Sequence, residues 1–130
     1  MRDRVVRKLQ ADHILTVMAL DIQEVTDNGI VRLALSGHLD SDTSKKLEER
    51  FTESYERGER YFIFDCAGLE YISSAGLRVL LLAAKRLERT EGDVVLAALQ
   101  GHVQRVFDLT GFSGIFNSYA TADEAAAQIK

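Results

Sequence analysis

The sequence has little that could hold a structure covalently or around a metal ion. It contains a single cysteine, Cys66, and neither proline nor tryptophan. A lone cysteine excludes an intramolecular disulfide, and the histidines at positions 13, 38 and 102 lack the spacing of a zinc site. Walker and Gly-x-Gly-x-x-Gly loops are also missing. We therefore expect no metal and no cofactor.

Long apolar runs and an excess of positive charge are absent as well. No stretch reaches the roughly 18 apolar residues that cross a membrane, and the N-terminus lacks the apolar run of a signal peptide. The formal net charge is −4, whereas contacts to phosphate backbones need a basic surface. The expectation is a cytoplasmic protein with no nucleic-acid partner and no membrane insertion.

What the sequence does contain is enough apolar residues for one core. The chain has 130 residues, of which 46% are hydrophobic, the usual size of one domain. Residues 1–17 are mixed and charged, with a weak apolar stripe, and we interpret them as an N-terminal extension of uncertain order. The pattern sharpens from residue 18, and no break divides 18–130.

Apolar periodicity predicts the order of the elements. Asn28-Gly29 stands between two alternating apolar segments and indicates an antiparallel hairpin. Helices are expected over 41–58, 74–92, 101–111 and 121–129, and strands over 60–68, 93–99 and 114–121. This alternation predicts an α/β fold with a mostly parallel sheet, an antiparallel N-terminal edge strand and about four helices.

Two adjacent serines, Ser73 and Ser74, stand where the helix over 74–92 should begin. A helix start needs one N-cap side chain, and either serine could do only that. Functional groups of parallel α/β sheets gather beyond the carboxyl ends of the strands, where Asp40 also lies. We expect Asp40 and Ser74 on the same rim, with small Ala75 and Gly76 leaving room for a large partner.

The residues DCAGLEYISSAGLRVLL, 65–81, resemble the signature of the STAS domain, in particular that of bacterial anti-sigma factor antagonists. The residues LSGHLDSDTS, 35–44, resemble a second block of that family. The two motifs, their spacing and the element order agree over roughly residues 18–130. The resemblance implies a single STAS-type domain over 18–130.

The resemblance also implies a phosphorylation switch. In the family, a GHKL-type serine kinase that is also the anti-sigma factor modifies the serine two places before the motif glycine. That glycine is Gly76 here, so the match is Ser74, with Ser73 as second choice. The unmodified protein would sequester the kinase and free a sigma factor, and a serine phosphatase would be a further partner. The implied partner-binding residues are Asp40, Tyr71, Ser73, Ser74, Ala75 and Gly76.

Two other interpretations stay within reach of the sequence. A scaffold subunit of a stress-signalling complex, or a small partner of a lipid-transport ATPase, would share the fold. An enzyme is not expected, because the Gly-x-Ser-x-Gly elbow of hydrolases is missing and Ile72 stands at its first glycine. Near the motif, Cys66 is interpreted as a small buried residue and Asp65 as a carboxylate that ties down the loop.

Overall fold

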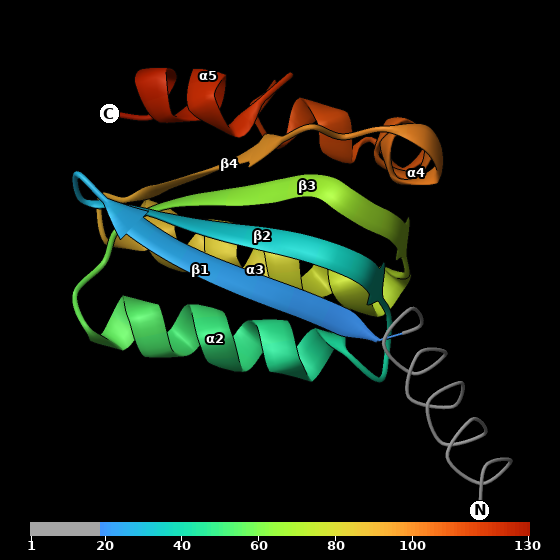
Figure 1. Cartoon of the computed structure of the whole chain (residues 1–130), viewed down its shortest axis with the longest axis horizontal. Helices are drawn as coiled ribbons and strands as arrows, with labels where there is room; N and C mark the ends of the chain where they lie inside the picture. The colour runs from blue at the N-terminus through green and yellow to red at the C-terminus, as the bar shows by residue number, and fades with distance from the viewer. Residues whose placement is uncertain (1–18) are drawn as a thin grey trace, which may run out of the picture.

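A computed structural model describes residues 19–130, which form a five-stranded sheet flanked by helices (Figure 1). The strand order is β1-β2-β3-β4-β5, so strands adjacent in sequence are adjacent in the sheet. The first pair is antiparallel and every later pair is parallel, as predicted. The strands are β1 (Leu20–Asp27), β2 (Ile30–Leu39), β3 (Tyr61–Ile72), β4 (Asp93–Ala97) and β5 (Ser118–Tyr119).

Three of the described α-helices lie in the connections between parallel strands, and the fourth follows the last strand. They are α2 (Ser44–Glu56), α3 (Ser74–Arg89), α4 (Gly101–Thr110) and α5 (Ala122–Gln128), with a short 3-10 helix, η1 (Phe112–Gly114). Within residues 19–130, none of them is long and apolar enough to cross a membrane. The predicted N-terminal extension, together with Met18, lies outside the described residues.

The β1–β2 hairpin confirms the turn that its sequence predicted. Asn28 and Gly29 have φ angles of 54° and 76°, the positive values that a two-residue turn of this kind requires. The turn fixes the register, which pairs Ile22 with Leu35 and directs both side chains into the core. Within residues 19–130, β1 pairs with β2 alone and forms one edge of the sheet.

The central strands are buried on both faces, which explains their continuous apolar runs. Helices α2 and α3 cover one face, where Phe51 and Leu80 join the same core as Phe62 and Phe64 (Figure 1). Helix α5 covers the opposite face, where a second group packs together: Ile30, Ile63, Val95, Ala97, Ala125 and Ile129. The two layers hold β3 from both sides and fix the direction in which it leaves the core.

Strand β3 is longer than predicted, which is a correction that bears on the site. The sequence predicted a strand ending near Gly68 and a loop up to the helix, whereas β3 continues to Ile72. Two irregularities in the β2–β3 register change the side-chain spacing, so that Cys66, Leu69 and Ile72 are buried at intervals of three. This spacing, together with polar neighbours, hid the strand from a search for alternation.

Two other element boundaries differ from the predicted ones, and each difference has a local cause. Helix α3 ends at Arg89 rather than at Gly92, because Glu91 adopts the left-handed conformation, with φ 61°. Gly92 is needed for packing, since a Cβ there would collide with the carbonyl oxygen of Arg60. The last strand is only two residues long, and Gly114, the first residue of the predicted strand, belongs to η1.

Candidate functional site

The candidate site lies on the rim formed by the extended ends of β2 and β3. Strand β4 pairs with β3 only as far as Asp65, so the residues beyond it project past β4. The last β2–β3 pair is Leu39 with Ile72, and the N–H of Ser73 donates to the carbonyl of Leu39 at 2.9 Å. Asp40 and Ser73 are thus each one residue beyond this pair, and Ser74, which the sequence predicted on the same rim as Asp40, follows directly after Ser73.

The two serines divide their tasks at the start of α3. Ser73 is the N-cap: its backbone is extended, and its Oγ accepts a hydrogen bond from the N–H of Gly76 at 3.4 Å. Ser74 is the first residue of the helix and is exposed to solvent. Its hydroxyl makes no hydrogen bond to any residue in the range 19–130. The helix therefore begins without using the Ser74 oxygen.

Gly76 is buried and brings the start of α3 close to β2. A Cβ at this position would lie 2.7 Å from Leu39 Cγ, 2.8 Å from the Leu39 carbonyl oxygen and 3.0 Å from Ile72 Cγ1. Atoms cannot approach so closely, so only glycine fits without movement of β2. The glycine fixes the helix start against the strand, which sets where Ser74 meets solvent.

Asp40 shapes the turn between β2 and α2. Its Oδ1 accepts hydrogen bonds from the N–H groups of Asp42 at 2.9 Å and Thr43 at 3.1 Å. The Thr43 hydroxyl in turn accepts from the N–H of Asp40 at 2.9 Å and donates to the carbonyl of His38 at 2.7 Å. Asp40 is half-buried, so it contributes a rigid, negatively charged edge beside the serines.

An aromatic group that the sequence analysis missed lies on the same rim. The Tyr71 ring, 40% exposed, stacks on His102 with centroids 5.2 Å apart and an angle of 2°. His38 lies 5.6 Å from Tyr71, which it faces across the β2–β3 pairing. The three residues come from β2, β3 and α4, so no local motif could have joined them. The Tyr71–His38 pairing became visible only with the extended strands.

Cys66 is buried, as predicted, whereas Asp65 bonds to a neighbour within β3 and not to a loop. The Asp65 carboxylate accepts a hydrogen bond from the N–H of Ala67 at 3.1 Å. Burial, and secondarily the charge of Asp65, raises the pKa of the Cys66 thiol to about 12. The thiol is therefore neutral near pH 7 and is a packing group rather than a nucleophile. Within residues 19–130, no cluster of His, Cys, Asp or Glu could hold a metal ion.

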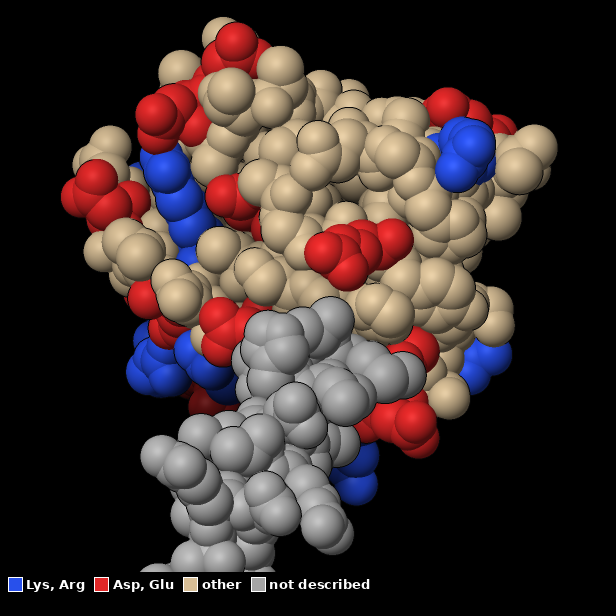
Figure 2. Space-filling model, turned by 45° about the vertical axis from the view of Figure 1, so that its right-hand side comes forward, with Lys and Arg blue, Asp and Glu red and all other residues tan. Residues whose placement is uncertain are grey.

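Figure 2 brings forward the side of the molecule that lies on the right in Figure 1. On the described part of this face, acidic and basic side chains form separate small groups within a mainly uncharged surface. A surface of this mixed kind suits contact with another folded protein, whose interfaces are about as polar as ordinary protein surface.

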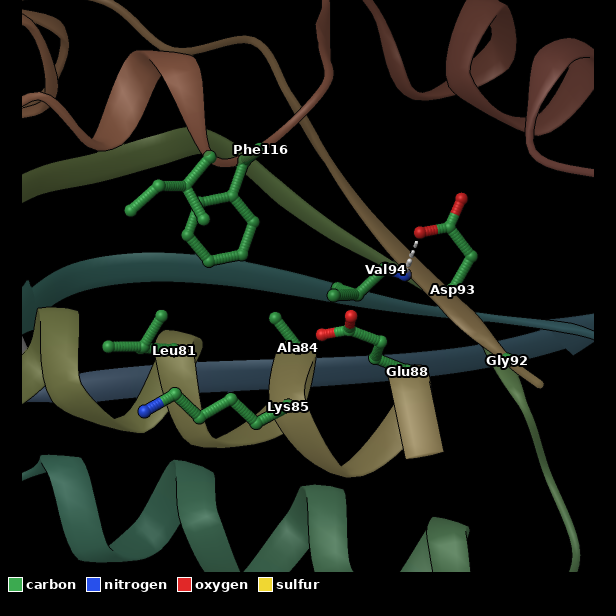
Figure 3. Close-up of a pocket in the computed structure, with 9 residues that line it drawn as sticks. Leu81, Ala84, Lys85, Glu88, Gly92, Asp93, Val94 and Phe116 are labelled. Atoms are coloured by element: carbon green, nitrogen blue, oxygen red, sulfur yellow. Dashed lines mark hydrogen bonds between the residues drawn. The ribbon is translucent and has the colours of Figure 1, made fainter. Parts of the chain in front are cut away.

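A pocket of about 400 Å³ lies elsewhere, between α3 and the start of β4 (Figure 3). Apolar side chains line part of it, and the carboxylate of Asp93 accepts a hydrogen bond from the N–H of Val94 at 2.8 Å. In Figure 3 the Lys85 amino group and the Asp93 carboxylate lie at opposite ends of the pocket. Its polar groups do not converge on one point, so the geometry gives no catalytic constellation.

The comparisons with known proteins agree with this geometry. The family model of the STAS domain matches residues 19–125, which include both motifs and the whole rim. This chain belongs to the STAS domain family. The resemblance inferred from the two motifs is thereby confirmed, and the STAS fold accounts for the sheet with one antiparallel edge strand.

Individual relatives span nearly the same STAS domain. BtrV of Bordetella bronchiseptica, named as a candidate anti-sigma factor antagonist, is 40% identical over 103 residues, which cover 79% of this chain and 89% of BtrV. The anti-sigma F factor antagonist of Paenibacillus polymyxa is 25% identical over 114 residues, 87% of this chain and 97% of the relative. The Bacillus cell fate determinant SpoIIAA, solved in its phosphorylated form, shares the fold with a TM-score of 0.67 at 20% identity, covering 85% of this chain and 99% of SpoIIAA.

Proposed function

We propose that this chain is an anti-sigma factor antagonist. In its unmodified form it binds an anti-sigma factor at the rim and so frees a sigma factor. The observation that carries this proposal is the exposed Ser74 hydroxyl, which makes no hydrogen bond within residues 19–130 and lies beside a separate N-cap. The likeness to BtrV supports the choice of partner. The proposed contact residues are Asp40, Tyr71, Ser73, Ser74, Ala75 and Gly76, of which buried Gly76 acts by positioning the others.

The switch that we propose is phosphorylation of Ser74 by the bound partner, a GHKL-type serine kinase. The Ser74 oxygen loses its proton and forms a bond to the γ-phosphorus of ATP, and ADP leaves. A serine phosphatase reverses the step by hydrolysis of the same bond. This cycle belongs in the cytoplasm, where ATP is available, and the chain takes part as substrate and binding module rather than as enzyme.

Phosphorylation suits this position because it changes the surface without breaking the fold. The phosphate adds about −1.5 to −2 charges at pH 7 and meets the positive end of the α3 dipole. A partner that docks on a neutral hydroxyl would then have to desolvate that charge, which is unfavourable without a cationic group of its own. Asp40 on the same rim adds to the negative potential. The phosphorylated form should therefore release the partner.

The site assignment is tested by mass spectrometry after incubation with the cognate kinase and ATP. Wild type and Ser73→Ala should each gain one phosphate on residue 74, and Ser74→Ala should gain none. If Ser73→Ala abolished the modification while Ser74→Ala kept it, the site would move to Ser73. If neither serine were modified in wild type, the switch would have to be abandoned.

Partner capture tests the function itself. Unmodified protein should retain a GHKL-type kinase from a lysate, and Ser74→Asp should bind that kinase at least about tenfold more weakly, a difference of about 1.4 kcal/mol. Ser74→Ala is the matched control and should bind like wild type. Capture of a signalling scaffold or a transport ATPase instead would replace the proposal with one of the alternative STAS functions. Equal binding by Ser74→Asp and wild type would contradict the switch.

A further inference from the structure

The exposed face of α3 carries an arginine one helical turn beyond Ser74. Ser74 and Arg78 are four residues apart and both are exposed, and side chains at this spacing are neighbours with Cβ atoms about 5–6 Å apart. Helical side chains lean toward the N-terminus of their helix, so the Arg78 side chain leans toward Ser74. The next cationic residue of α3 is Lys85, which lies about 16 Å from Ser74 along the helix axis.

Arg78 also has no ionic partner in the described part of the chain. Among residues 19–130, the arginines within 4 Å of a carboxylate oxygen are Arg32, Arg50 and Arg57. The first turn of α3 contains no acidic residue at all. The helix therefore combines a first turn without acidic residues with a nearby guanidinium that has no carboxylate within 4 Å among residues 19–130.

We propose that Arg78 receives the phosphate on Ser74. This inference rests on the proposed phosphorylation of Ser74 and concerns what happens to the group once it is attached. The guanidinium has a planar set of N–H donors that can bind two phosphate oxygens together. The N–H groups of Ser74 and Ala75, which have no acceptor within residues 19–130, lie at the same end of the helix.

The pair gives the switch a second component. In the unmodified protein, the Arg78 guanidinium is available to an acidic group of the partner. In the phosphorylated protein, it is held within the chain by the phosphate. The modification then adds negative charge and withdraws positive charge from one surface in a single step, with no movement of the sheet. Arg78 acts as a positioning residue for the phosphate.

The test uses full-length protein with phosphoserine encoded at position 74, so that no kinase is needed. The second ionisation of the phosphate is followed by ³¹P NMR in otherwise wild-type protein and in Arg78→Gln. The guanidinium favours the dianion, so its removal should raise this pKa by about 0.3. The other charged groups of the rim, Asp40, Asp42, Glu70, His38 and His102, are the same in both proteins and cancel in the difference.

Two further variants distinguish a local ion pair between Arg78 and the phosphate from an effect of the net charge of the protein. Arg78→Lys keeps the positive charge and should restore most of the shift, whereas Arg89→Gln removes a cation from the far end of α3 and should change nothing. The Arg78 Nε–H resonance should also move on phosphorylation. Equal phosphate pKa values with and without Arg78 would overturn the inference. Because phosphoserine is encoded, that result would leave the proposed kinase reaction untouched, and failure of the kinase reaction would leave the pair untouched.

Discussion

Helices α3 and α5 begin with the same capping arrangement and then diverge. In α3 the Ser73 oxygen accepts from the N–H three residues on at 3.4 Å, and in α5 the Thr121 oxygen does so at 3.1 Å. The first turn of α5 contains Asp123 and Glu124, whereas that of α3 contains no acid. The first helical residue of α3 is Ser74, which is exposed. One capping rule has therefore produced two different helix ends.

The difference shows how a fold can keep a helix end open for chemistry. The positive end of α5 is balanced by its own carboxylates, and Asp123 also pairs with Arg32 on β2 at 2.8 Å. The first turn of α3 consists of the small residues Ser74, Ala75 and Gly76, and the buried Gly76 anchors it against β2. Packing against β2 stabilises the start of α3 without a carboxylate in its first turn. A negative charge added there by phosphorylation therefore changes the electrostatic potential of the surface.

Substitution at the third helical position should give the largest difference in stability between α3 and α5. Gly76→Ala places a Cβ against Leu39 and should lower the free energy of unfolding by about 2 kcal/mol, although alanine is the better helix former. Glu124→Ala, at the same position of α5, should lower it by only about 0.5 kcal/mol, because it removes one carboxylate from the positive end of the helix dipole. Urea denaturation measures both. Similar losses would mean that α3 can shift on β2 more easily than its contacts imply.

Removal of either N-cap hydroxyl should lower stability by the same amount, which is smaller than the loss for Gly76→Ala. Ser73→Ala and Thr121→Ala each remove the oxygen that accepts from the third helical N–H, and each should lower stability by about 1 kcal/mol. Thermal unfolding of the two variants and of Ser73→Thr, which keeps the hydroxyl, makes the comparison. A neutral Ser73→Ala would show that the longer of the two hydrogen bonds contributes nothing.

An acidic residue added at the first helical position should stabilise α3, whose first turn has no acid, but not α5, whose first turn already has two. Ser74→Asp supplies the anion that α3 lacks and should raise stability by about 0.5 kcal/mol at low ionic strength. Ala122→Asp adds a third acid to α5 and should give no gain. The effect of Ser74→Asp should shrink as salt is added. A destabilising Ser74→Asp would contradict an open positive end at α3.

The sequence was informative wherever a rule acts over a few residues. Asn28-Gly29 predicted its turn, and the ends of two neighbouring parallel strands predicted that Asp40 and Ser74 share a rim. These outcomes depend on local backbone preferences or on a shared fold. They did not require knowledge of which strands would lengthen.

Features that depend on tertiary pairing were missed. The continuation of β3 to Ile72 follows from its pairing with β2, where two register irregularities disturb the alternation. The stack of Tyr71 on His102 joins β3 to α4 across a distance that no motif spans. The division between Ser73 and Ser74 was left open by the sequence, because both residues satisfy the N-cap preference until the backbone shows which one precedes the first turn.

The smallest expected effect is the most informative for function. Ser74→Ala removes an exposed hydroxyl that makes no hydrogen bond within residues 19–130, so stability should change by less than about 0.5 kcal/mol. Ser73→Ala, one residue away, is the matched control, because it removes the N-cap hydrogen bond and should lower stability. Urea denaturation of both variants under the same conditions decides the point. If Ser74→Ala lost as much as Ser73→Ala, the Ser74 oxygen would belong to the fold, and it could no longer be regarded as a group kept free for modification.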